Sequence, residues 1–183
     1  TLFLLSSCSP FSNSKDSKKI IADGLTPKEL YEIAEAKVNG GSIDQAIDQY
    51  RLILTSYPSS KYAIQAKLDI AFNLYKRKKY DLAIVELNDF IQKYPSIEPT
   101  PYAYYLRGVI SEAKSSSILD SLVTDPAQRD VDSVKDAYVY FNELIDKFPK
   151  SKYSIDANKK LLSLIEVLAR HEFYIAIYYT KNN

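Results

Sequence analysis

The chain has 183 residues, a formal net charge of +1 and 46% hydrophobic residues. This length suits one substantial domain or a short repeat array, and the near-neutral charge gives no field that would favour nucleic acid as a partner. A single cysteine excludes an intramolecular disulfide, and a single histidine excludes a metal site built from several histidines.

The N-terminal residues combine an apolar run, small residues and the lone Cys8. Residues 1–7 are interpreted as the remnant of a signal peptide. Leu5-Ser6-Ser7-Cys8 resembles a bacterial lipobox, which implies lipid attachment to Cys8, and Ser9 resembles the outer-membrane sorting pattern. The alternative is a chance apolar terminus with a free thiol. Residues 8–25 would be the lipidated cysteine and a flexible tether, whose last seventeen residues reach at most about 55 Å.

The predicted repeat domain, residues 26–183, opens with two helix-start signals. Thr26, Pro27 and Glu29 form a capping box with proline at the first helical position. Asn39-Gly40-Gly41 ends this helix. Ser42 and Gln45 predict a second capping box for the following helix.

One spacing recurs three times along the chain. In each copy a small residue precedes a bulky residue by four positions, and a proline follows the small residue by twelve. The three copies are Ala46, Tyr50 and Pro58; Ala83, Leu87 and Pro95; and Ala137, Phe141 and Pro149. Four positions is one helical turn, so the small and bulky residues share a helix face, and the proline ends the helix. The spacing predicts the second helix of a repeated helix hairpin.

The remaining elements follow from the same signals. Helices are expected after Ser60, from Tyr80 to about Tyr94, from Pro101 to about Lys114, from about Asp132, and from Ser151 to about Thr180. Residues 115–131 are predicted as an insertion, for which a functional face and a tolerated surface loop are equally favoured.

Two further features are open to more than one interpretation. The basic run Lys76–Lys79 favours a solvated turn over a phosphate or nucleic-acid patch, because no aromatic residues alternate with it in the sequence. The last helix keeps an apolar stripe without a following helix in this sequence. We therefore expect either a continuation of the protein or a partner to cover it.

The helix pairs resemble tetratricopeptide repeats, although the chain has no Trp, and Ile53 and Phe90 replace a later small residue. We predict an all-α, tetratricopeptide-like helix-hairpin solenoid with about three repeats and a long final helix. The lipobox, the YPSSKYAIQAKLDIAFNLYK run, YAYYLRG, QRD, FPKSKYSIDA and LARHEFYIAIYYTK occur in that order. Together they resemble the lipoprotein family of the outer-membrane β-barrel assembly machinery, whose full-length members carry five repeats.

This resemblance implies a non-enzymatic scaffold, lipid-anchored at the periplasmic face of the outer membrane of a Gram-negative bacterium. Its partners would be BamA, other machinery subunits and the C-terminal signals of unfolded outer-membrane proteins. By position in the predicted groove, the peptide-binding candidates are Tyr31, Tyr62, Tyr75, Tyr104, Tyr105 and Arg107. At least half of these tyrosines are expected to serve helix packing. The partner-binding candidates are Arg129, Asp130, Arg170, Glu172, Tyr178 and Tyr179. For Arg129 and Asp130 an intrachain ion pair is preferred.

Two other classes of function stay open. One is another periplasmic repeat adaptor of envelope or division complexes, which would lack acylation at Cys8. The other is a lipoprotein hydrolase that uses carboxylates such as Glu112, Asp120 or Asp125, but no pattern places two acids on one rigid face. No cofactor or metal is expected, and nucleic acid is not expected as a partner.

Overall fold

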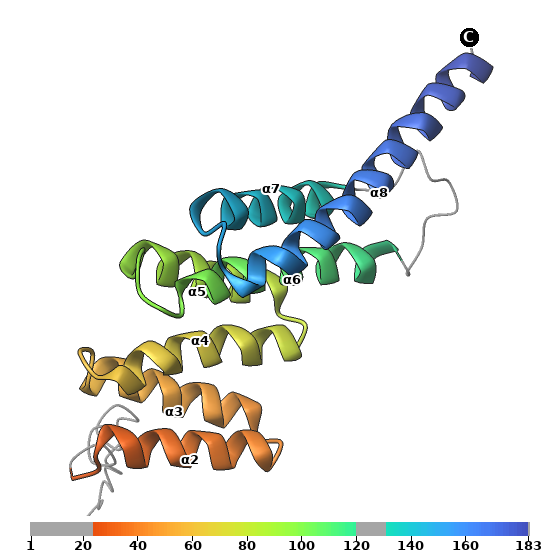
Figure 1. Cartoon of the computed structure of the whole chain (residues 1–183). Helices are drawn as coiled ribbons and strands as arrows, with labels where there is room; N and C mark the ends of the chain where they lie inside the picture. Colours follow the sequence, from red (N-terminus) through yellow and green to blue (C-terminus); the bar gives the residue numbers. More distant parts are fainter. Residues whose placement is uncertain (1–23, 120–130, 183) are drawn as a thin grey trace, which may run out of the picture. The chain divides into compact units, whose positions relative to one another are not determined.

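The computed structural model describes residues 24–119 and 131–182, and every regular element in these ranges is an α-helix (Figure 1). The helices are α2 (Pro27–Asn39), α3 (Ile43–Ser56), α4 (Lys61–Lys76), α5 (Tyr80–Lys93), α6 (Thr100–Leu119), α7 (Asp132–Lys147) and α8 (Lys152–Asn182). The chain divides into two compact units, and the boundary between Ala66 and Lys67 lies inside α4. The predicted all-α class is confirmed.

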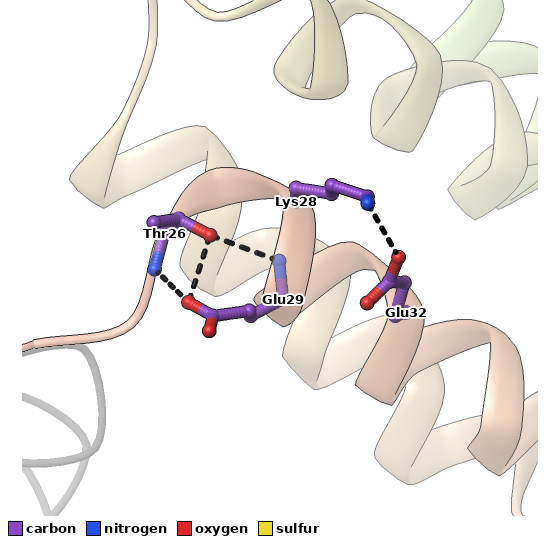
Figure 2. A network of polar contacts seen from close by, with 4 residues as sticks. All are labelled: Thr26, Lys28, Glu29 and Glu32. Atoms are coloured by element: carbon purple, nitrogen blue, oxygen red, sulfur yellow. Dashed lines mark hydrogen bonds and ion pairs between the residues drawn. The ribbon is translucent and has the colours of Figure 1, made fainter.

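The first unit begins with the predicted capping box (Figure 2). Glu29 N donates to Thr26 Oγ1 at 3.3 Å, and Thr26 N donates to Glu29 Oε2 at 2.7 Å. The hydrogen bonds from the Thr26 backbone and side chain hold the pKa of Glu29 below its usual value. The neighbouring Lys28–Glu32 ion pair is exposed at 3.4 Å, so it adds little stability. This end of α2 is therefore fixed mainly by its cap.

Helix α2 ends in a Schellman motif centred on Gly41, whose φ is 76°. Gly41 N donates to Val38 O at 3.0 Å, and Ser42 N donates to Lys37 O at 2.9 Å. Glycine has no Cβ to oppose this left-handed conformation. The predicted stop at Asn39-Gly40-Gly41 is thus confirmed.

Helix α4 ends with the same pair of hydrogen bonds, but Lys78 occupies the left-handed position at φ 57°. Lys78 N donates to Tyr75 O at 2.8 Å, and Lys79 N donates to Leu74 O at 2.9 Å. Lys78 follows Gly41 by the same interval that separates Pro58 from Pro95. The turn after α2 and the turn after α4 therefore have the same geometry. In the second turn a lysine, not a glycine, adopts the left-handed conformation, which is strained for a residue with a Cβ.

The recurrent spacing marks the buried faces of α3, α5 and α7. All three small residues are fully buried, and the bulky residues are at most 2% exposed (Ala46, Tyr50; Ala83, Leu87; Ala137, Phe141). Each helix ends two residues before its proline, and the residue between them is an aromatic C-cap whose N–H donates to the carbonyl four residues earlier (Tyr57, Tyr94 and Phe148). The predicted second helices and their stops are confirmed.

In the second unit, α5 packs on α6, α6 on α7, and α7 on α8. Phe141, Leu144 and Ala157 are fully buried in a cluster that joins α7 to α8. Helix α6 approaches this cluster through Gly108, where an added Cβ would lie 2.5 Å from Cε1 of Phe141. This contact fixes α6 against α7 and so positions the polar side chains that α6 presents.

Two local predictions are corrected. Ser42 precedes α3, but its side chain makes no capping hydrogen bond, because its backbone is not extended. Gln45 Oε1 instead accepts a hydrogen bond from Lys37 Nζ at 3.0 Å, so the Gln45 side chain binds to α2 and does not cap at Ser42. The second capping box is therefore wrong, although α3 begins where expected.

Helix α6 continues to Leu119 rather than ending near Lys114. Ser115 is 4% exposed, and its Oγ donates to Glu112 O at 2.7 Å, so the first serine of the run satisfies its hydroxyl within the helix. The predicted insertion at 115–131 thus begins as helix. Residues 120–130, which include Arg129 and Asp130, lie outside the described residues.

Candidate peptide- and partner-binding surfaces

Two candidate tyrosines meet in the first unit. Tyr31 from α2 lies with its ring centroid 5.6 Å from that of Tyr62 from α4, and 5.5 Å from that of the buried Tyr50. Lys61 Nζ lies 5.3 Å from the Tyr62 ring centroid. Tyr31 and Tyr62 remain partly exposed. Their rings therefore pack two first helices together and still present aromatic surface.

Tyr75 belongs to another aromatic row at the end of α4. Its ring centroid lies 6.2 Å from that of Phe72 and 6.2 Å from that of Tyr80 at the start of α5. Tyr75 is partly buried, whereas Phe72 is 39% exposed. The row brackets the basic turn between the two helices.

Tyr104 serves packing. It is 5% exposed, and its ring centroid lies 5.6 Å from that of Phe148 at the end of α7. The Arg107 guanidinium carbon lies 5.1 Å from the Tyr104 ring and 4.0 Å from the Tyr140 ring. Tyr104 thus packs against both Phe148 and the Arg107 guanidinium, in agreement with the expectation that some of the candidate tyrosines are structural.

Arg107 is buried between α5, α6 and α7 and is already paired. Its NH1 donates to Asn88 Oδ1 at 2.8 Å, and its NH2 forms an ion pair with Glu143. The side chain is 9% exposed, and within the described residues its Nε has no hydrogen-bond partner. A peptide carboxylate at Arg107 would have to compete with Glu143 and Asn88, because these side chains already bind both terminal nitrogens of the buried guanidinium.

Tyr105 links α6 to α8. Its O–H donates to Asp156 Oδ2 at 2.5 Å, and its ring stacks on Tyr153 with centroids 5.4 Å apart. Burial raises the pKa of Tyr105 well above its usual range, and the hydrogen bond to Asp156 and its negative charge raise it further. Tyr102 joins the cluster at 5.5 Å from Tyr153, and burial raises its pKa as well.

A second polar contact between α6 and α8 involves Glu112. Lys160 Nζ lies 2.7 Å from Glu112 Oε2, and both side chains are about 30% exposed. Glu112 is thus neutralised by a cation, while Asp120 and Asp125 lie outside the described residues. Across the described ranges no group of three or more metal-binding side chains comes together.

The sequence did not single out Glu143, Tyr140 or Asp156 as partners of the candidate residues. Their contacts join helices that are far apart in the chain, and no local pattern encodes such pairs. For Asp156 the sequence offers a partial signal, because Tyr153 and Ala157 on either side of it repeat the first-helix pattern of Tyr62 and Ala66. That pattern predicts which face of the helix is buried, but it does not predict the hydrogen bond from Tyr105.

The C-terminal half of α8 extends beyond α6 and α7 (Figure 1), and most of its residues are exposed. Leu164 is the last buried residue of this helix. Beyond it lie exposed large apolar side chains, namely Ile165, Val167, Phe173, Tyr174, Tyr178 and Tyr179. The predicted stripe is therefore uncovered over half the helix, and no described helix packs on it.

The partner-binding candidates of α8 lie within this exposed half. Arg170 forms an exposed ion pair with Glu166 at 2.6 Å, and Glu172 is 69% exposed. Tyr178 and Tyr179 are 47% and 62% exposed, with ring centroids 5.6 Å apart. All four side chains are thus accessible to a partner. Within the described part of the chain, no helix is long and apolar enough to cross a bilayer. Cys8 lies outside this part.

Helix pairs with a recurrent small-to-bulky face, joined by equivalent turns, define this chain as a helical repeat protein. Residues 23–183 match the model of the YfiO family, described as an outer membrane lipoprotein. The chain belongs to this family, and the predicted resemblance is confirmed.

Several relatives are named "Outer membrane protein assembly factor BamD". The one from Neisseria gonorrhoeae is 32% identical over 178 residues, covering 97% of this chain and 66% of the relative. Those from Xylella fastidiosa strain 9a5c and Pasteurella multocida are 29% and 30% identical and are covered over 61% and 68% of their length. The chain thus spans about two thirds of the length of these relatives.

Solved structures with a similar fold include MamA from Desulfovibrio magneticus RS-1, with a TM-score of 0.56 and 18% identity over 92% of this chain and 85% of that chain. A MamA double mutant has a TM-score of 0.53. At this identity the likeness concerns the fold alone, and it confirms the helical repeat architecture.

Proposed function

We propose that the protein is a non-enzymatic scaffold in the assembly of outer-membrane β-barrel proteins. The observation that carries this proposal is the similarity to BamD assembly factors along nearly the whole chain. The structure is consistent with a scaffold, because its candidate side chains form packing and ion-pair contacts between helices. Lipid on Cys8 would hold the repeats at the periplasmic face of the outer membrane.

Unfolded outer-membrane proteins are the proposed substrates, bound through their aromatic C-terminal signals. Tyr31 and Tyr62 are the best supported contacts, because they come from successive first helices and keep exposed ring surface. Rings in a repeat groove suit an extended peptide with an aromatic end. Arg107 is the least supported member of the set, since Glu143 and Asn88 already hold its guanidinium.

BamA is the proposed principal partner, with the exposed half of α8 as the contact. Tyr178 and Tyr179 supply the type of side chain that is enriched in interface centres, and Arg170 and Glu172 supply charges beside them. Arg129 and Asp130 are secondary candidates for this contact, because an intrachain ion pair between them and the neighbouring helices is the preferred interpretation of these two residues.

Purification of the tagged protein from solubilised envelopes tests this function. We expect a barrel-forming outer-membrane subunit to co-purify, and we expect a Tyr178→Ser/Tyr179→Ser variant to recover less of it. A Lys135→Ser/Lys150→Ser variant, changed at two exposed positions outside α8, is the control. Recovery of only inner-membrane or division proteins would support the alternative envelope adaptor instead.

A further inference from the structure

The turn between α4 and α5 carries four consecutive cations, Lys76 to Lys79, and all four residues are exposed. The turn places four cationic side chains in succession at the surface of a protein whose overall charge is close to zero. Such a surface attracts anionic partners over about one Debye length.

Apolar side chains lie beside these cations. The Phe72–Tyr75–Tyr80 row joins the end of α4 to the start of α5, directly across the basic turn. Phe72 is 39% exposed, and Leu82 and Val85, one turn apart on α5, are 55% and 62% exposed. Aromatic residues do not alternate with the basic run in the sequence. The hairpin of α4 and α5 nevertheless places Phe72, Tyr75 and Tyr80 next to it.

The backbone of the turn is strained at Lys78. Lys78 adopts the left-handed conformation, which Gly41 adopts without strain at the equivalent turn of the first repeat. A lysine here keeps the run of cations continuous at a conformational cost. Because Lys78 is strained and exposed, and because it makes the run of cations continuous, its charge is a candidate for a functional role.

We propose that the α4–α5 turn, residues 72–85, is a membrane contact that docks on anionic phospholipid headgroups. Basic side chains would meet the headgroup phosphates, while Phe72, Leu82 and Val85 enter the interfacial layer. A lipid surface fits better than an acidic protein segment, because exposed aromatic and aliphatic side chains flank the cations and the family consists of outer membrane lipoproteins. The inference rests on the membrane location proposed above and adds a second contact to the acyl anchor.

Vesicle binding by the full chain with Cys8→Ser tests this contact, because that substitution removes any acyl anchor. The probes are vesicles of phosphatidylglycerol mixed with phosphatidylcholine, and vesicles of phosphatidylcholine alone. The patch variant is Lys76→Gln/Arg77→Gln/Lys79→Gln, and the matched control is Lys135→Gln/Lys150→Gln/Lys159→Gln, three exposed lysines on α7, α8 and the turn between them. Both triple variants lower the net charge by three.

Each basic side chain near an anionic surface strengthens adsorption about fivefold, so the patch variant should partition about 100-fold less onto the anionic vesicles. The control should change severalfold at most, and added salt should weaken binding of the parent chain. Phe72→Ser, with its charges intact, should also reduce binding. A thermal melt of each variant checks its fold.

Absence of binding to anionic vesicles, or equal losses in the two triple variants, would overturn the proposal. Binding to polyglutamate without binding to vesicles would also overturn it and would identify an acidic protein segment as the ligand. None of these results bears on barrel assembly, which is measured separately in cells.

Discussion

Gly108 on α6 lies so close to Phe141 on α7 that a Cβ at Gly108 would come within 2.5 Å, 2.7 Å and 2.8 Å of three carbons of the ring. Phe141 is fully buried and belongs to the recurrent bulky positions. The helix pair is therefore closer at this point than any side chain would allow. The absence of a side chain at Gly108 is therefore what allows α6 to approach the Phe141 ring.

Gly108→Ala should destabilise the protein, although alanine is the better helix former. The helix-propensity gain is about 1 kcal/mol, whereas overpacking against a fully buried ring costs about 1–3 kcal/mol. Urea unfolding would measure the difference, and Gly108→Ala/Phe141→Leu should recover part of the loss. An increase in stability for the single variant would show that the two helices can separate freely.

Lys78→Gly should stabilise the protein by about 1 kcal/mol, because it removes the left-handed strain that Lys78 carries. Lys76→Gly, two residues earlier in the last turn of α4, is the matched control and should cost up to about 1 kcal/mol. Gly41→Lys should destabilise the first repeat. From highest to lowest, the expected thermal midpoints are those of Lys78→Gly, the parent chain and Lys76→Gly. A midpoint of Lys78→Gly below that of the parent would contradict the strain at Lys78.

Ala83→Leu or Ala137→Leu should each cost about 1–3 kcal/mol, since both alanines are fully buried where paired helices meet. Val85→Leu enlarges a side chain that is 62% exposed on the same α5 helix, and its midpoint should stay near that of the parent. An unchanged midpoint for both alanine variants would mean that these faces do not set the helix spacing.

Stability should fall in alkaline solution, in part through Tyr105. Its pKa is raised in the folded state, so its contribution is fully present below the ordinary tyrosine value of 10.0 and is lost as the pH rises above it. Tyr105→Phe should therefore reduce the slope of unfolding free energy against pH above about pH 10. Tyr178→Phe, at an exposed position, is the control. Identical slopes in the parent and Tyr105→Phe would contradict the Tyr105–Asp156 contact.

Local signals accounted for most of the fold. The Ala-to-Pro spacing located α3, α5 and α7 because helix period and proline chemistry act within a dozen residues. Thr26 and Gly41 marked the ends of α2 for the same reason. The end of α6 was misplaced because a serine run favours a break by propensity, while the burial of Ser115 favours helix.

The candidate surfaces were less predictable from sequence. The tyrosines were placed on the first helices, but the partners of Arg107 and Tyr105 come from helices distant in the chain. The aromatic row across the basic turn was likewise hidden, because Phe72, Tyr75 and Tyr80 meet only when α4 and α5 form a hairpin. Pairings of this kind depend on tertiary packing, which periodicity does not specify.

Depletion of the protein in its own bacterium, followed by measurement of folded outer-membrane barrels by their heat-dependent gel mobility, tests its role in barrel assembly. We expect fewer folded barrels and an accumulation of their unfolded forms after depletion, and we expect normal amounts to return when the protein is supplied again. Normal amounts of folded barrels after depletion, with defects confined to division or the inner membrane, would contradict a role in barrel assembly.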